Sequence, residues 1–101
     1  MSSPEFLQAV KDSLRVAGTD LNTEIQDLID AAKADLILSG VLEFKVTETD
    51  PLIKRAIIVY CKANFGYEDP RYADRFQESY ISLKHHLTLS AEYTTEGDLS
   101  G

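Results

Sequence analysis

The sequence has few of the residues on which small proteins build covalent, metal-bound or catalytic sites. Its 101 residues include one cysteine, two histidines, no tryptophan and five glycines that stand singly. A lone cysteine, Cys61, excludes an internal disulfide and is typical of a reducing cytoplasm. No apolar run approaches the roughly 20 residues of a transmembrane helix, and the first residues lack the features of a signal peptide. We therefore expect neither a membrane span nor a secretion signal.

Glycine-rich phosphate loops and metal-ligand clusters are missing as well. Adjacent His85 and His86 would diverge by about 100° on a helix, so they cannot both face one ion. Cysteine and histidine together are too few for an ordinary structural zinc site. Cys61 falls in a segment that we expect to be buried, where thiols are usually inert. The carboxylates show no spacing typical of an acid–base pair. The sequence predicts no enzyme, no metal and no cofactor.

Charge is distributed unevenly along the chain. The formal net charge is -7, of which residues 1–50 carry -6, residues 51–87 carry +2 and residues 88–101 carry -3. An acidic chain is a poor candidate for binding nucleic acid, because that affinity comes mostly from neutralising phosphates. Two explanations stay open: a solvated acidic surface, or acidic and mildly basic regions that attract each other between copies or partners.

Hydrophobic periodicity predicts four helices in a single domain. The expected ranges are about 4–16, 23–38, 51–65 and 70–87. Asp50-Pro51 and Asp69-Pro70 each combine an N-cap carboxylate with a proline suited to the first helical position. The fold class is therefore all-α: a small bundle of about four helices, with an extended loop between the second and third helices and a flexible C-terminal arm.

The loop at residues 41–49 has an imperfect alternation in which Leu42, Phe44 and Val46 point the same way. Two interpretations stay open. The apolar residues could cover the domain's own core, or the segment could be an extended arm that pairs with a neighbouring subunit.

The helix expected at 51–65 is apolar on most of its circumference, because Ile58, Val59 and Cys61 extend its primary face. A helix of this kind is buried on most sides. It is either the central helix of the bundle or a helix whose surplus apolar surface contacts another copy. On the second interpretation, the residues at the subunit interface are Ile58, Val59 and Lys62.

The last part of the chain combines an aromatic helix with a segment that loses helical periodicity. The helix at 70–87 has a stripe typical of a core, formed by Tyr72, Phe76, Tyr80, Leu83 and Leu87. Residues 88–101 are rich in Thr, Ser, Gly and acids, so we expect a flexible arm after a domain at 1–87. Alternation of Leu89, Ala91 and Tyr93 would let the arm add to a partner.

The stretch PLIKRAIIVYCKANFGY at residues 51–67 resembles the head–tail connector proteins of long-tailed bacteriophages and related prophages. The helix that follows is similar through Arg75-Phe76-Gln77, Tyr80 and Leu83-Lys84. The first half matches more loosely, through Leu28-Ile29 and Ala31-Ala32-Lys33.

This resemblance implies a non-enzymatic head-completion adaptor of the virion, made in the bacterial host cytoplasm. Such proteins form a ring on the phage portal protein, although the free protein can be a monomer. The ring extends the DNA channel without specific DNA binding and offers a docking surface to the next head-completion (stopper) or tail protein. Portal binding would fall to Leu87, Leu89 and Tyr93. The alternative is a small DNA-interacting packaging or regulatory protein that uses Lys54, Arg55 and Lys62.

Overall fold

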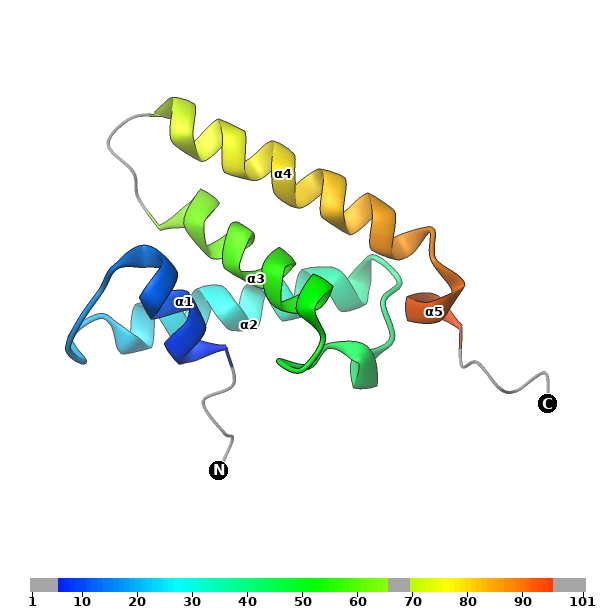
Figure 1. The fold of residues 1–101 in the computed structure, drawn as a ribbon, viewed down its shortest axis with the longest axis horizontal. Coiled ribbons are helices and arrows are strands. Elements are labelled where there is room, and N and C mark those ends of the chain that lie inside the picture. The colour runs from blue at the N-terminus through cyan, green and yellow to red at the C-terminus, as the bar shows by residue number, and fades with distance from the viewer. Residues whose placement is uncertain (1–5, 66–69, 96–101) are drawn as a thin grey trace.

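The computed structural model describes residues 6–65 and 70–95, and 76% of it is helical. The elements are α1 (Leu7–Leu14), α2 (Asn22–Leu38), the 3-10 turn η1 (Glu43–Lys45), α3 (Pro51–Asn64), α4 (Pro70–Thr88) and α5 (Ala91–Thr94). Figure 1 shows α3 in the middle, with α1 and α2 on one side, α4 on the other, and α5 beyond the end of α4. No strand occurs in the described ranges, so the fold is all-α, as predicted.

The central position of α3 decides between the two interpretations that its apolar circumference left open. α3 packs against α1, α2 and α4. Ile58 is 8% exposed, Val59 is 1% exposed and Cys61 is fully buried within this single chain. Of the two interpretations, the structure shows the central helix of the bundle, because neighbouring helices of the same chain enclose α3 on several sides. The core therefore accounts for the apolar circumference without a second copy.

The start of α3 follows the predicted chemistry. Asp50 is extended at the N-cap, and its Oδ1 accepts hydrogen bonds from the amides of Leu52 and Ile53 at 2.9 and 3.2 Å. Pro51 occupies the first helical position, where its missing N–H has no partner to lose. The cap predicted at Asp69-Pro70 involves residues outside the described ranges.

α1 ends earlier than expected, at Leu14 rather than near Val16. Arg15 adopts a left-handed conformation with φ 61°, and the amides of Arg15 and Val16 bond back to the carbonyls of Asp12 and Lys11. This closure satisfies carbonyls that a helix end leaves open. Arg15 is thereby fixed at the exposed tip of α1, and Gly18, with φ 82°, lies in the loop that follows.

The segment between α2 and α3 covers the core of its own domain. Val41 and Val46 are 2% and 5% exposed, whereas Phe44 is 63% exposed. The predicted alternation is wrong because η1 coils the middle of the segment and turns Phe44 outward. Of the two open interpretations, the structure shows the loop that contributes to its own core.

α4 lies along α3 and is also tied to α2. The ring of Tyr80 meets the ring of Tyr60 edge to face, with 5.0 Å between their centroids. The hydroxyl of Tyr80 donates to Asp35 on α2, and Lys84 Nζ donates to the same oxygen at 3.0 Å. Burial works against the charged form of Asp35, but these two donors outweigh it and lower the pKa of the carboxyl. Of the predicted stripe, Tyr80 and Leu87 are buried and Tyr72 is 53% exposed.

Candidate functional site

Two surfaces at different places on the bundle combine features that suit contacts with other proteins. The first, which we call the seat, is the surface of residues 41–50 on which the C-terminal segment, residues 89–95, packs. The second is an open cationic groove between α1, α3 and α4.

In the seat, residues that were expected to form a free arm are folded onto the domain. The amide of Leu42 donates to the carbonyl of Tyr93 at 2.8 Å. The hydroxyl of Tyr93 donates to Asp50 Oδ1 at 3.1 Å, which is the same oxygen that caps α3. Leu87 and Tyr93 are 1% and 6% exposed. The expected boundary between domain and arm at residue 88 therefore differs from the structure, in which residues up to 95 belong to the packed unit. Residues 96–101 lie outside the described ranges.

The physical environment of Tyr93 marks it as an anchor. Burial raises the pKa of its phenol to about 12, assisted by the hydrogen bond to Asp50 and by the negative charges of Asp50 and Glu92. Between the two buried anchors, Leu89 is 73% exposed. The three residues predicted to bind a portal thus separate into two that hold the segment and one that faces outward.

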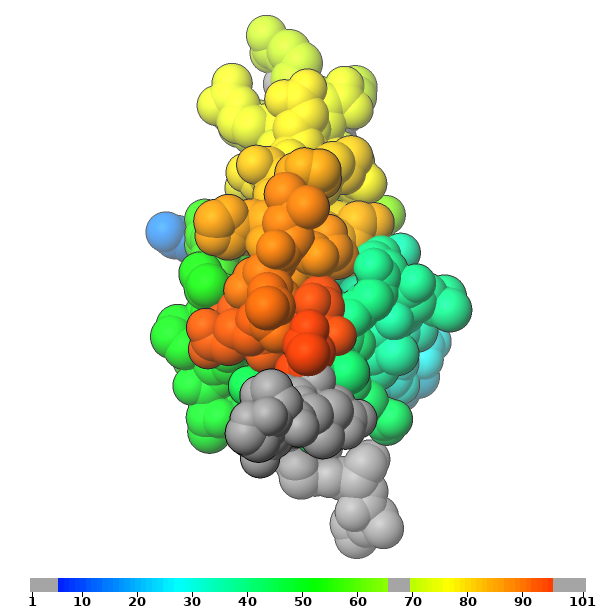
Figure 2. Space-filling view, turned by 90° about the vertical axis from the view of Figure 1, so that its right-hand side faces the viewer, coloured from blue at the N-terminus to red at the C-terminus, as the bar shows by residue number. Residues whose placement is uncertain are grey.

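Other apolar side chains are exposed on the segments that neighbour the C-terminal segment. Leu38 ends α2 and is 86% exposed, and Phe44 on η1 is 63% exposed. The bond from Leu42 to Tyr93 joins this stretch of chain to the C-terminal segment. Figure 2 shows α5 and the end of α4 beside the residues that follow α2, all on one end face of the molecule. This end therefore presents apolar side chains from three separate elements.

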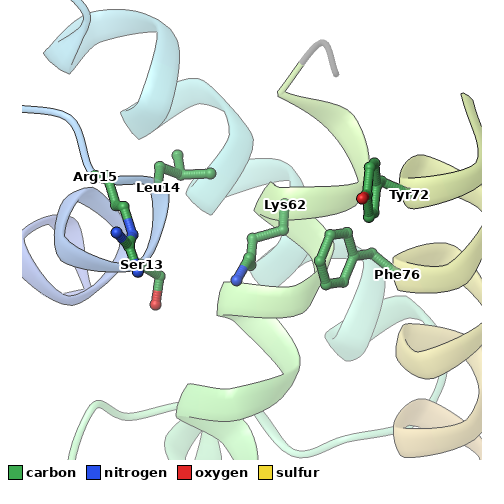
Figure 3. A pocket seen from close by; sticks show the side chains of 6 residues that line it. All are labelled: Ser13, Leu14, Arg15, Lys62, Tyr72 and Phe76. Atoms are coloured by element: carbon green, nitrogen blue, oxygen red, sulfur yellow. The ribbon is translucent and has the colours of Figure 1, made fainter. Parts of the chain in front are cut away.

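The cationic groove is lined by side chains from three helices and has a volume of about 360 Å³. Its lining residues are Ser13, Leu14, Arg15, Lys62, Tyr72 and Phe76. Figure 3 shows Lys62 of α3 between the α1 residues on one side and Tyr72 and Phe76 of α4 on the other. Lys62 Nζ lies 4.9 Å from the centroid of the Phe76 ring, a cation–π contact that holds the charge in place.

The phage connector protein family model matches residues 6–94, which is most of the chain and nearly all of the described part. The chain belongs to the phage connector protein family. Members have a structural role at the head–tail connection, as components of the virion that contact other phage head or tail proteins. No curated protein and no solved structure matches the sequence.

The three residues predicted at a subunit interface of the connector have different surroundings. Ile58 and Val59 are buried in the core, whereas Lys62 is half-buried and lines the groove. Of the cations named for DNA binding, Lys54 is half-buried and Arg55 is exposed on the same helix. In the described ranges of the connector, no helix is long and apolar enough to cross a membrane, and no group of three or more potential metal ligands gathers.

Sequence reasoning missed several residues of both surfaces in the connector. The sequence gives no role to Arg15 and places Tyr72 and Phe76 in the core stripe, although all three line the groove. Asp50 was recognised as a helix cap but not as the partner of Tyr93, which lies 43 residues away. One signal was available in the sequence: Tyr72 and Phe76 fall in the first turns of the helix expected at 70–87.

Proposed function

We propose that this connector protein joins the phage portal to the next head-completion or tail protein, assembling on the portal as a ring that extends the DNA channel. The observation that carries the proposal is the match of the phage connector protein family over residues 6–94. A net charge of -7 is compatible with a channel wall along which DNA slides, since an acidic surface repels phosphate.

The end face around Leu89 is the surface that we assign to the portal. Exposed apolar patches mark contact sites on small domains, and Leu38, Phe44 and Leu89 are exposed on segments that lie at this end. Leu89 makes the direct contact. Leu87 and Tyr93 act by holding the segment in position, because both are already buried against the bundle.

The test is to mix the full-length protein with purified portal and to weigh the complex by native mass spectrometry. Leu89→Asp should weaken binding by about 10- to 100-fold, since fully burying a leucine contributes about 1.5–3 kcal/mol and each 1.4 kcal/mol is tenfold. The matched control is Ile81→Asp, which places the same charge at a residue that is 50% exposed on α4. The control should bind like the unmodified protein.

Two results would contradict the proposal. A portal that forms no complex with the intact protein would refute portal binding itself. Equal binding by the Leu89→Asp and Ile81→Asp proteins would refute the assignment of the end face. Binding of duplex DNA by the free protein, weakening steeply with added salt, would favour the alternative of a DNA-interacting packaging or regulatory protein.

A further inference from the structure

Two cations of the groove, Arg15 and Lys62, have no acidic partner among the described residues. No acidic side chain is among the described residues that line the groove. Arg15 is exposed at the tip of α1, and Lys62 is held over the Phe76 ring. Leu14, Tyr72 and Phe76 supply apolar walls around these two cations. The chemistry of the groove therefore suits an extended segment with two carboxylates and one apolar side chain.

This chain contains a segment of that chemistry. Glu96, Asp98 and Leu99 follow one another within four residues, and residues 88–101 contain no lysine or arginine. The other acid-rich stretch, α2, is a regular helix, and a helix of 10–12 Å diameter is a poor fit to a groove of about 360 Å³. Charge complementarity thus favours the segment at 96–99 over the acids of the first half.

A copy cannot readily fill its own groove. Leu99 lies four residues beyond Thr95, which is a reach of at most about 14 Å. Tyr72 and Phe76 lie in the first turns of α4, whereas Thr95 follows α5 beyond the other end of that helix. Along α4 alone, the rise from Phe76 to Thr88 is about 18 Å. Figure 1 shows α5 at one side of the molecule, and α1 and the start of α4 at the opposite side.

We infer that the acidic segment Glu96–Leu99 of one copy docks in the cationic groove of the next copy. The donor segment follows α5, whereas the acceptor groove lies at the opposite end of the described domain. A contact between two such different surfaces is head to tail and the same on every copy. Such a contact closes into a ring when the rotation between copies divides a full turn. The inference rests on the proposed ring, but its test uses no portal, so it can fail while portal binding stands.

The first experiment is zero-length carbodiimide coupling in a concentrated equimolar mixture of ¹⁵N-labelled and unlabelled full-length protein. The reagent joins Lys62 Nζ to the carboxylate of Glu96 or Asp98 only where the two touch, with loss of water. We expect cross-linked peptides in which one half is labelled and the other is not. Cross-links confined to single chains, or no link between Lys62 and residues 96–98, would overturn the inference.

Variants distinguish a specific contact from general attraction. Arg15→Glu keeps the reactive lysine and the exposed position, and it should lower the yield of the Lys62 cross-link about fivefold or more, as expected for reversing one partner of exposed ion pairs. The matched control is Arg55→Glu, which makes the same charge change at an exposed site on α3 outside the groove. Equal loss in both variants would show that only net charge matters and would overturn the inference.

A charge exchange gives a second readout that does not depend on cross-linking chemistry. One protein carries Arg15→Glu and Lys62→Glu, and the other carries Glu96→Lys and Asp98→Lys. Each should self-associate at least about fivefold more weakly than the unmodified protein in sedimentation equilibrium. An equimolar mixture should regain association, because the basic segment of the second protein matches the acidic groove of the first. Folded variants that do not associate when mixed would overturn the inference.

Discussion

The bond between Tyr80 and Asp35 allows a sharp test of how α4 is held to the rest of the bundle. Tyr80 is 1% exposed, and its hydroxyl donates to Asp35 on α2, across a sequence separation of 45 residues. Tyr80→Phe removes the hydroxyl and keeps the ring against Tyr60. Lys84 remains within 3.0 Å of Asp35, so the carboxylate is not left without a donor.

The expected loss of stability follows from the surroundings of Asp35. A hydrogen bond to a charged group contributes about 1.5–3 kcal/mol. The side chain of Asp35 is 36% exposed, so water screens the interaction and replaces part of it. We therefore expect the free energy of unfolding to fall by about 1–2 kcal/mol. With a urea m-value of about 1 kcal/mol/M, the midpoint should fall by about 1–2 M.

Urea unfolding followed by far-ultraviolet circular dichroism measures this change, and Tyr60→Phe is the control. Tyr60→Phe keeps the ring contact with residue 80. The hydroxyl that it removes has no hydrogen-bond partner among the described residues, so the midpoint should move by less than about 0.5 M. Equal midpoints for Tyr80→Phe and the unmodified protein would refute the reasoning.

The loss of stability in Tyr80→Phe should also depend on pH. The pKa of Asp35 is lowered on folding, so its contribution is fully present above the ordinary carboxyl pKa of about 3.9 and is lost as pH falls through the lowered value. The difference in stability between the unmodified protein and Tyr80→Phe should be constant near neutral pH and shrink below about pH 4. A stability difference that grows as the pH falls would contradict the lowered pKa of Asp35.

Three further outcomes are expected. Burial raises the pKa of Cys61 to about 12, so a thiol reagent should label it only after urea unfolds the protein, and labelling of the folded protein would contradict its burial. Asp50→Ala should lower the unfolding free energy by about 1 kcal/mol and speed hydrogen exchange at Leu42, whereas Asp50→Ser should retain most of the cap. Because the pKa of Tyr93 is raised to about 12, the stability that this phenol gives to the folded protein is present below about pH 10 and is lost as pH rises through 12. Tyr93→Phe should remove this pH dependence from unfolding curves measured at alkaline pH.

Much of the fold could be predicted because its signals are local. The cap at Asp50 depends on a carboxylate and the amides two and three residues later. The buried stripe of α2, with Ile25, Ile29, Ala32 and Leu36, follows helical spacing. Signals of this kind are complete within one turn or one face, so they need no knowledge of what packs nearby.

The errors concern relations between distant segments. The apolar circumference of α3 indicated burial on most sides, but the sequence could not say whether the covering came from the same chain. α5 contains four residues, too few for a hydrophobic period, and it is held by Leu42 and Asp50 from another part of the chain. The groove draws on three helices, so no single stretch contains its pattern.

α3 links the two candidate surfaces as a rigid spacer. Asp50, at its beginning, holds Tyr93, and Lys62, near its end, lines the groove. Twelve residues of helix set these points about 18 Å apart. One residue inserted between them would lengthen the spacer by about 1.5 Å and twist one end by about 100° relative to the other. In the proposed ring, the length of α3 would set the offset between successive copies. Such an insertion would change the position and rotation of each copy relative to the next, even if each surface stayed intact.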